Sequence, residues 1–426
     1  MNPTATSTLE RVTDLRQRKI ISQIVDRNTT VTLGDDDPLE NDMVLNMGPQ
    51  HPATHGVLRV LLRLDGETVA ACVPELGYLH RGYEKIAENM TYHEFLPHTD
   101  RLDYLSPLSN NVAYALAVEK AAGIEIPARA EWIRMMICEL ARISSHLMAM
   151  GATAMDVGAI TMLLWTFRER EKLYDIFTKI CGARFTTSYT RIGGVATDFT
   201  PDIVPMISSF IDEFPGHLKD FEGLVNRNRI FIERLRGVGY MGADDCIALG
   251  LTGAVLRGAG VAHDLRRDAP YMSYNDYDFD VITYTDADAY GRYMVRIDEM
   301  RESLKIVRQL LERIPEGEIM ANDAEKVLPK KQEIYTRMEE LIQDFMLINF
   351  GTQVPAGQVY SAIESPKGEL GFYICSQGGG EPWRLKIRSP SFCNLQALQR
   401  MAEGQMISDV VAIIGALDPV MGEADK

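Results

Sequence analysis

The chain has 426 residues, of which 46% are hydrophobic and 24% are charged, and its formal net charge is −16. This composition is typical of a globular protein with ample buried core. The acidic balance excludes a general nucleic-acid binder and disfavours direct docking on an anionic membrane, since both functions need clustered Lys and Arg. The six cysteines include no CxxC pair, so we predict reduced, buried thiols in a cytosolic protein rather than iron–sulfur ligands.

No signal or transit peptide is expected at the start, because acidic and basic residues are mixed over the first thirty positions. Between residues 142 and 168 the only formally charged side chain is Asp156. Gly151, Asp156 and Gly158 divide this stretch into two shorter apolar pieces. We therefore predict two buried core helices here rather than a membrane span.

Residues 1–40 are predicted to form an extended N-terminal arm. Residues 41–85 form a small antiparallel sheet region that carries a loop with His55. In this region a strand over 57–64 is followed by the turn dipeptide Asp65-Gly66 and a returning strand over 69–73.

Residues 86–350 are predicted to form a helix bundle, because apolar side chains recur every three or four positions in three stretches. Stripes of this kind more often pack in a core than contact a cofactor. The stripes are Trp132, Met136, Leu140, Ile143, Leu147 and Met150; Ile297, Met300, Leu304, Val307, Leu311 and Ile314; and Ile334, Met338, Leu341, Ile342 and Phe345.

Residues 351–426 return to strands and turns and end in a helix and a tail. Strands are predicted at 368–374 and 384–388, and one final helix over 394–417. The fold class that follows is α+β, a central helix bundle with small antiparallel sheet regions at its ends.

Two patterns resemble ligand sites but lack the required context. Residues 237–242 spell GxGxxG, yet the preceding run has helical spacing, so Gly237 is interpreted as a helix terminus and not as a nucleotide loop. His93 and His98 are separated by Pro97, and His51 lies with His55 in a Gly/Pro loop. Neither pair has the geometry or the third ligand of a zinc site, and no metal is predicted.

Three further strings carry a resemblance: RGYE at 81–84, RLDYLS at 101–106 and DPVMGE at 418–423. They are similar to the metal-binding motifs RGxE-x16-RxCGxC and DPCxxC of [NiFe]-hydrogenase large subunits. The four cysteine positions hold Asp103, Ser106, Val420 and Glu423, none of which supplies a thiolate for nickel and iron. The chain thus keeps the rest of the two hydrogenase motifs but lacks their metal-ligating cysteines.

The chain resembles the NuoD (49-kDa) family of respiratory complex I over roughly residues 41–426, and that family reuses the former metal cavity for a quinone headgroup. The segments that carry this resemblance, besides the motifs above, are 46–56, 79–89, 182–184, 191–194, 382–386 and 390–392. The resemblance implies an α+β, hydrogenase large-subunit-like fold. It also implies a quinone-binding subunit in the peripheral arm of a proton-translocating NADH:quinone oxidoreductase (NDH-1), on the cytoplasmic side of a bacterial inner membrane.

By the same resemblance, quinone is the substrate and the chain holds no metal or nucleotide of its own. Electrons would come from a terminal [4Fe–4S] cluster on a NuoB-type partner, and NADH would be oxidised elsewhere in the complex. NuoC-, NuoI- and NuoH-type subunits are the other expected partners, and nucleic acid is not one. Three alternatives stay open: a related complex fed by ferredoxin or deazaflavin, a membrane-bound hydrogenase subunit, and a scaffold without a ligand.

The resemblance also implies residue roles. His55 and Tyr104 would donate hydrogen bonds to the two sides of the headgroup, Asp156 would pair with His55, and Arg81 would lie near the partner's cluster. Thr186 stands where the family has a histidine, so we expect a weaker link between cluster potential and pH. Without the family, the sequence favours His55 as a loop residue bonded to backbone. The alternatives of Tyr104 as a packing residue and of Asp156 as the cap of a helix starting near Ala159 stay open.

The chemistry suits these residue types. Reduction of a quinone takes two electrons and two protons, and the protons must come from groups within hydrogen-bond reach. A histidine, with a reference pKa near 6.5, can hold and release a proton at neutral pH. A tyrosine, with a pKa of about 10, yields its proton only to a strong base such as the doubly reduced quinone.

Overall fold

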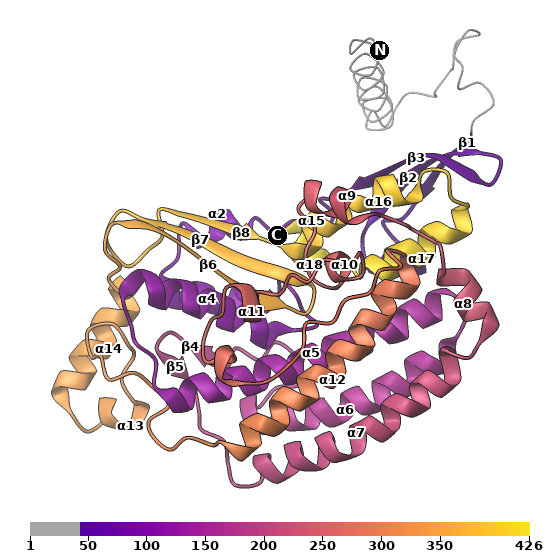
Figure 1. The fold of residues 1–426 in the computed structure, drawn as a ribbon. Coiled ribbons are helices and arrows are strands. Elements are labelled where there is room, and N and C mark those ends of the chain that lie inside the picture. Colours follow the sequence, from indigo (N-terminus) through magenta and orange to yellow (C-terminus); the bar gives the residue numbers. More distant parts are fainter. Residues whose placement is uncertain (1–42) are drawn as a thin grey trace. The chain divides into compact units, whose positions relative to one another are not determined.

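The computed structural model describes residues 43–426; the predicted N-terminal arm, residues 1–40, lies outside the described residues. Helices and short antiparallel sheets are mixed along the chain, which confirms the α+β prediction (Figure 1). Two three-stranded sheets and one two-stranded ribbon are present in this part of the chain.

The first sheet has the strand order β1 (Met43–Met47), β2 (Arg59–Asp65), β3 (Thr68–Glu75). Strands β2 and β3 form the predicted hairpin, closed by the pair Asp65 and Thr68. Gly66, with φ of +60°, supplies the left-handed residue that this tight turn needs.

Four long helices form the bundle and run side by side in Figure 1: α5 (Ala128–Asp156), α6 (Ile160–Cys181), α7 (Ile203–Val225) and α12 (Ala289–Glu312). Helix α5 is buried along most of its length and packs against α6, α12 and α17. The stripe predicted at 132–150 falls on α5 and faces the core. The stripe predicted at 297–314 is buried on α12 as far as Val307, whereas Ile314 lies beyond the end of α12 and is 41% exposed, so its last position is not core. Among the described residues, no helix is long and apolar enough to cross a membrane.

The second sheet consists of β6 (Gly357–Ser365), β7 (Gly368–Ser376) and β8 (Arg384–Arg388), as predicted for the last two strands. Helix α4 (Pro107–Ala122) packs against β6 and β7. The segment 101–106, which contains Tyr104, leads directly into α4, with Ser106 at its N-cap.

The prediction of one final helix over 394–417 is wrong. The structure has α15 (Pro390–Leu395), α16 (Ala397–Ala402), α17 (Ile407–Leu417) and α18 (Met421–Asp425). The break lies at Gly404, which has φ of +79° and donates its N–H to Val69 O, while Val69 N donates to Gln405 O. The segment thus pairs with the edge strand β3, and that contact outweighs the local helical preference.

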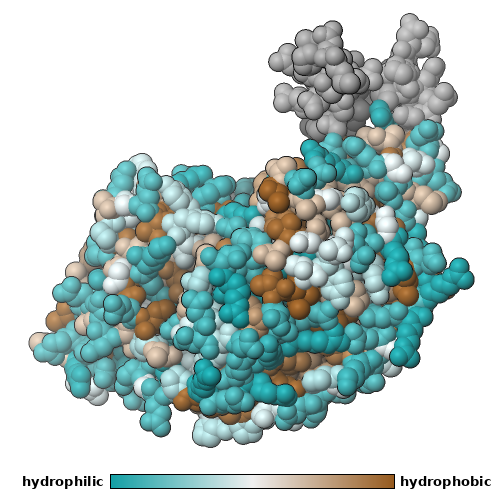
Figure 2. All heavy atoms as spheres, viewed as in Figure 1, coloured by the Kyte–Doolittle hydropathy of each residue, from teal (hydrophilic) through white to brown (hydrophobic). Residues whose placement is uncertain are grey.

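The third predicted stripe, 334–345, lies on α13 (Lys331–Ile334) and α14 (Met338–Phe350) and is not core in this chain. Met338, Leu341, Ile342 and Phe345 are 52–69% exposed. On the face shown in Figure 2, polar residues predominate and hydrophobic residues form separate patches.

The remaining elements are short and connect the parts above. They are η1 (Pro52–Thr54), α2 (Tyr83–Ala87), α3 (Tyr92–Thr99), β4 (Thr190–Arg191), β5 (Gly194–Val195), α8 (Arg229–Leu235), α9 (Ala243–Ala248), α10 (Ala254–Arg257), α11 (Leu265–Asp268) and η2 (Tyr274–Asp276). The GxGxxG string follows helix α8 and not a strand, which confirms that it lacks the context of a dinucleotide loop.

Candidate functional site

His55 lies at the end of the one-turn helix η1, in the left-handed conformation with φ of +48°. Its Nε2 is 3.0 Å from Asp156 Oδ2, and the two side chains are 12% and 4% exposed. The histidine therefore bonds to a carboxylate contributed by a segment 101 residues away.

Asp156 is the last residue of α5, and it does not cap the next helix. Helix α6 has Ala159 at its N-cap and no side-chain cap. Gly415 of α17 lies against the carboxylate: a Cβ at that position would be 2.9 Å from Asp156 Oδ2. Thr153, one turn before Asp156, donates to Gly415 O at 3.1 Å, so α17 is held close to this end of α5.

Tyr104 lies between α3 and α4 and is half-buried. A Cβ at Gly422 would be 3.4 Å from Tyr104 Cδ1 and closer still to two backbone oxygens, so only glycine allows this approach. Burial, and then the neighbouring Asp103, raise the pKa of Tyr104 to about 12, against a backbone hydrogen bond from Met421.

The same C-terminal segment contacts the loop of His55. A Cβ at Gly56 would lie 3.7 Å from Met421 Cγ. Met421 and Gly422 thus link the loop that carries His55 to Tyr104, which brings together three segments that are far apart in the sequence.

The four positions that correspond to hydrogenase cysteines are all enclosed. Asp103, Ser106, Val420 and Glu423 are at most 1% exposed. Ser106 Oγ donates to Ser109 Oγ at 2.8 Å. Within residues 43–426, no group of three or more His, Cys, Asp or Glu is arranged to hold a metal ion.

Asp418, the left-handed C-cap of α17, carries the main ion pair of this region. Its Oδ2 pairs with Lys367 Nζ and lies 4.0 Å from Arg296 Nε. Burial opposes ionisation of Asp418, but Lys367 and Arg296, with a further contribution from His55, outweigh it and hold the pKa of this carboxyl below its usual value.

Sequence reasoning missed Lys367. The residue lies in the turn between β6 and β7, where a lysine is normally solvated, and it is only 4% exposed. The string Pro366-Lys367-Gly368 indicates a turn but gives no sign that it folds inward.

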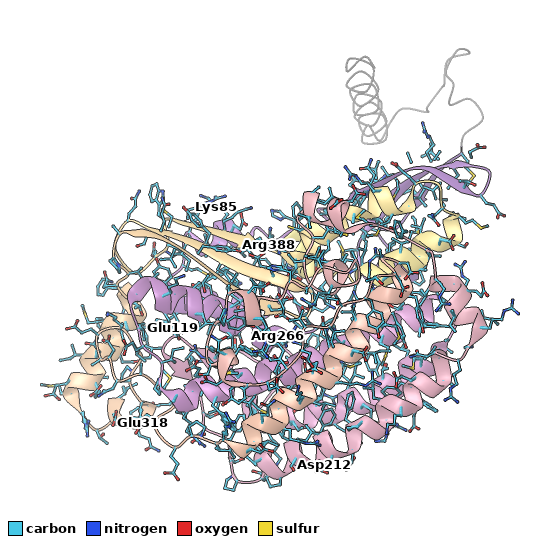
Figure 3. The ribbon with its side chains drawn as sticks, in the orientation of Figure 1. Lys85, Glu119, Asp212, Arg266, Glu318 and Arg388 are labelled. Atoms are coloured by element: carbon cyan, nitrogen blue, oxygen red, sulfur yellow. The ribbon has the colours of Figure 1, made fainter. Side chains whose placement is uncertain are left out.

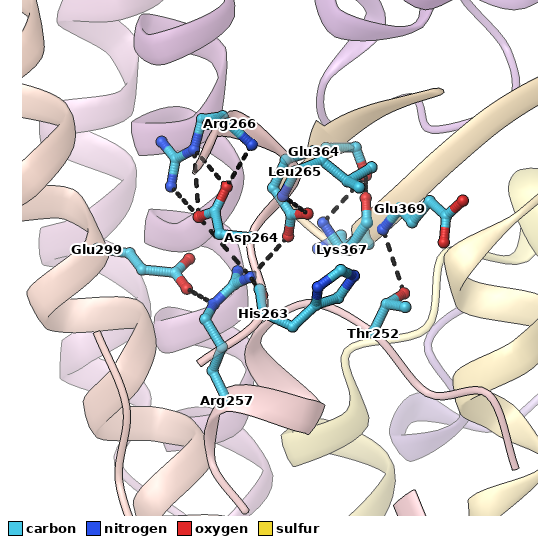
Figure 4. Close-up of polar contacts among 12 residues, drawn as sticks. Thr252, Arg257, His263, Asp264, Leu265, Arg266, Glu299, Glu364, Lys367 and Glu369 are labelled. Atoms are coloured by element: carbon cyan, nitrogen blue, oxygen red, sulfur yellow. Dashed lines mark hydrogen bonds and ion pairs between the residues drawn. The ribbon is translucent and has the colours of Figure 1, made fainter. Parts of the chain in front are cut away.

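A second set of buried charges was also missed; we call it the arginine cluster. Figure 4 shows Arg257 bonded to Glu299 at 2.6 Å and to Glu364 at 2.7 Å. Arg266 joins the same cluster through its ion pair with Asp264 at 2.7 Å, and it reaches Glu139 at 3.2 Å. In Figure 3, Arg266 lies in the interior, in contrast to the surface residues Lys85 and Asp212.

Arg81 and Thr186 lie apart from this interior. Arg81 is exposed just before α2 and donates to Tyr83 Oη at 3.1 Å. Thr186 is half-buried with φ of +51°. The surface position leaves the Arg81 guanidinium accessible to another chain.

Comparison with known proteins gives the class. Residues 156–426 match the family described as the respiratory-chain NADH dehydrogenase 49-kDa subunit. An NADH-quinone oxidoreductase D-type subunit of Chloroherpeton thalassium is 59% identical over 97% of this chain and 94% of its own length. The D-type subunit of Salinibacter ruber is 55% identical over 92% and 87%, and one from Rhizobium meliloti is 52% identical over 90% and 96%.

Such matches define a subunit of a respiratory-chain oxidoreductase. The chain belongs to the 49-kDa (D) subunit family of NADH-quinone oxidoreductase, complex I. Because the chain belongs to this family, the alternative of a membrane-bound hydrogenase subunit is excluded.

Proposed function

We propose that this chain binds the quinone headgroup between His55 and Tyr104 and supplies both protons for its reduction. The observation that carries the proposal is that one short C-terminal segment lies against both parts of the site: Met421 lies against Gly56, the residue after His55, and Gly422 lies against the ring of Tyr104. Of the two proton-bearing side chains, His55 is held by a carboxylate and Tyr104 is half-buried.

The two proton donors act at different stages. The bond to Asp156 fixes the orientation of the His55 ring and places a carboxylate beside the group that would give the first proton. With its pKa at about 12, Tyr104 keeps its proton until a strongly basic oxygen is present. A doubly reduced quinone is such a base and the oxidised quinone is not, so proton release follows electron arrival.

Loss of the His55 proton would leave Asp156, a side chain only 4% exposed, as an unpaired anion. We propose that this change of charge is what the membrane part of the complex senses during proton pumping. Gly415 and Thr153 support the idea, because they couple the position of the Asp156 carboxylate to helix α17.

Electrons would enter from a [4Fe–4S] cluster on a NuoB-type subunit, with Arg81 at the surface facing that partner. A cation beside the cluster raises its reduction potential and draws electrons to the end of the chain. NADH would be oxidised in another part of the complex, and the chain would lie at the cytoplasmic side of a bacterial inner membrane, with NuoC-, NuoI- and NuoH-type neighbours. The exposed apolar residues of α14 support burial in an assembly, since a monomer rarely exposes such a surface.

Photolabelling with an azidoquinone tests the proposal. The purified complex is irradiated with the probe, and the labelled peptides of this chain are mapped, with and without an excess of native quinone. We expect label on the peptides that contain His55 and Tyr104, removed by the competitor. Label that stays away from both segments, or that native quinone does not displace, would exclude headgroup binding at this site.

A further inference from the structure

Asp103 and Glu423, which we call the acid pair, are two buried carboxyls without full hydrogen bonding. They are 1% and 0% exposed. Asp103 Oδ2 and Glu423 Oε1 each lack a hydrogen-bond partner among the described residues. A buried carboxylate oxygen without a donor is costly, and a proton on the pair removes much of that cost.

The remaining oxygens have identified partners. Asp103 Oδ1 accepts from Leu105 N at 3.0 Å, and Glu423 Oε2 accepts from Ser391 Oγ at 2.7 Å. Ser391 also accepts from Val420 N at 3.3 Å, which ties it to the same C-terminal segment. The pair is thus fixed in place by neutral donors, one on each side.

The nearby cations are engaged elsewhere. Lys367, in the turn before β7, pairs with Asp418. Lys426 at the C-terminus donates to Ile387 O at 2.6 Å. Arg170 of α6 donates to Ser144 Oγ at 3.1 Å, and it interacts with Asp103 only through its charge.

Two more charged groups complete the surroundings. Arg296 of α12 lies nearest to Asp418. Asp425, on the same helix as Glu423, is satisfied by the N–H groups of Gly77 and Leu79 at 2.7 and 2.6 Å. The acid pair is therefore the part of this region where negative charge is not matched by a direct ion pair.

Burial, and next the charge of Asp103, raise the pKa of Glu423 to about 8, against smaller opposing effects of Ser391, Lys367 and Lys426. Burial also raises the pKa of Asp103, with Lys367 opposing. At neutral pH, Glu423 consequently keeps its proton.

Each member of the acid pair is next in the chain to a residue of the Tyr104 site. Asp103 precedes Tyr104 in the chain, and Gly422, which precedes Glu423, contacts the Tyr104 ring. Asp103 also contributes to the raised pKa of Tyr104, so the two protonation sites interact through charge.

We propose that Asp103 and Glu423 hold one proton between them and return it to Tyr104 after Tyr104 has protonated the reduced quinone. The inference rests on the proposed function. Two electrons from the partner's iron–sulfur cluster and two protons, from His55 and Tyr104, convert quinone to quinol. The O–H bond of the Glu423 carboxyl then breaks and the Tyr104 phenolate regains its proton, leaving a carboxylate that is reprotonated from water before the next turnover. The transfer is downhill, because a phenolate with a pKa of about 12 is a stronger base than a carboxylate with a pKa of about 8.

The test is the pH profile of quinone reduction by the purified complex, with NADH:ferricyanide activity as the assembly control. In the unaltered enzyme we expect the rate to decline as pH rises through about 8, where Glu423 loses its proton. Asp103→Asn removes a charge that raises this pKa and should move the decline to lower pH. Ser391→Ala removes a hydrogen bond that lowers it and should move the decline to higher pH. In Glu423→Gln the decline should be absent and the rate low throughout, and Glu381→Gln, an exposed acid, should change nothing.

Opposite shifts in Asp103→Asn and Ser391→Ala would support the shared proton, because a purely structural defect does not move a pH profile in two directions. Shifts in the same direction, or none, would overturn it. Infrared spectra of the resting complex give a second measurement: the band of a protonated carboxyl should titrate near pH 8 and be missing in Glu423→Gln. The infrared band is measured without turnover and therefore tests only the protonation of the acid pair. It can support or exclude the shared proton even if substitution of Tyr104 shows that the proposed function is wrong.

Discussion

The arginine cluster and the acid pair are both buried, yet their carboxylates meet different partners. In the cluster, Glu299 and Glu364 each bond Arg257 directly, at 2.6 and 2.7 Å. In the pair, one oxygen of Asp103 and one of Glu423 have no donor among the described residues. The pKa values of Glu299 and Glu423 diverge: Arg257 and His146 overcome burial and hold the pKa of Glu299 well below its usual value, whereas burial and Asp103 raise that of Glu423. Glu364 lies between these cases, because burial raises its pKa although Arg257 opposes this.

The difference separates buried charge that supports the fold from buried charge that can take part in a reaction. Glu299, whose pKa is lowered by Arg257, stays ionised near neutral pH. Glu423, with a pKa of about 8, changes protonation near neutral pH, and the residue before it, Gly422, lies against the tyrosine of the candidate site. Substitutions in the arginine cluster should therefore reduce stability and assembly, whereas substitutions in the acid pair should change pH dependence.

The largest effect is expected from Arg257→Met in the arginine cluster. The change leaves Glu299 and Glu364 buried without their cation, at a cost of about 3–5 kcal/mol of stability. We expect a strong loss of assembled complex, measured as NADH:ferricyanide activity and native-gel content of membranes. Arg400→Met is the matched control, because its ion pair with Asp245 is exposed and contributes at most about 1 kcal/mol. Normal assembly of Arg257→Met would show that the cluster is not essential to the fold.

Glu423→Gln should change the pH dependence of local stability. The unfolded carboxyl ionises near its model value of 4.5 and the folded one at about 8, so the folded state binds the extra proton between these values. Stability near α18 therefore falls as pH rises through this window, by up to about 1.4 kcal/mol per unit. Hydrogen exchange of the C-terminal peptides in the complex, corrected for intrinsic rates, should show this slope in the parent and a flatter one in the variant. Equal slopes would mean that Glu423 is ionised at neutral pH.

Asp156→Asn should weaken coupled turnover with little effect on assembly. The variant keeps a hydrogen-bonding side chain next to His55 but loses the carboxylate charge that the proposed coupling depends on, so fewer protons should be pumped per NADH. The measurement is proton pumping per NADH oxidised in sealed vesicles, against ferricyanide reduction. Unchanged pumping would remove Asp156 from the mechanism.

Gly415→Ala tests the same contact between His55 and Asp156 with a smaller expected effect. The added Cβ would meet Asp156 Oδ2 at 2.9 Å and turn the carboxylate away from His55, an off-rotamer cost of about 0.5–1.5 kcal/mol. We expect a loss of quinone reduction of less than about tenfold. Gly216→Ala, on α7 with open space around its Cβ, should have no such effect. A loss of the same size in both variants would point to a general effect of helix substitution.

Local patterns carried much of the fold prediction. The hairpin β2–β3 follows from β-rich runs on both sides of a turn dipeptide, and helices α5 and α12 follow from 3.6-residue spacing; these are properties of residues close in the sequence. The break at Gly404 does not, because it depends on pairing with Val69, more than three hundred residues earlier. The exposure of α14 has a similar origin: an apolar stripe shows that a surface is to be covered but not which chain covers it.

In the candidate site, too, local patterns were not enough where long-range contacts decide the structure. The sequence alone left His55, Tyr104 and Asp156 with ordinary structural alternatives, and family resemblance singled them out. The bond between His55 and Asp156 joins segments that no local pattern connects. Lys367 and Ser391 were not found at all, because their burial results from how the β6–β7 turn and α15 meet the C-terminal segment.

The central claim, that Tyr104 protonates the bound quinone, is tested most directly by Tyr104→Phe. Quinone reduction is measured in membranes, with NADH:ferricyanide activity as the control for assembly. The proposed role predicts that quinone reduction falls by about 100-fold while the control is unchanged, because the ring still packs against Gly422 and only the proton is lost. Quinone reduction at the parent rate would contradict it and reduce Tyr104 to a packing residue.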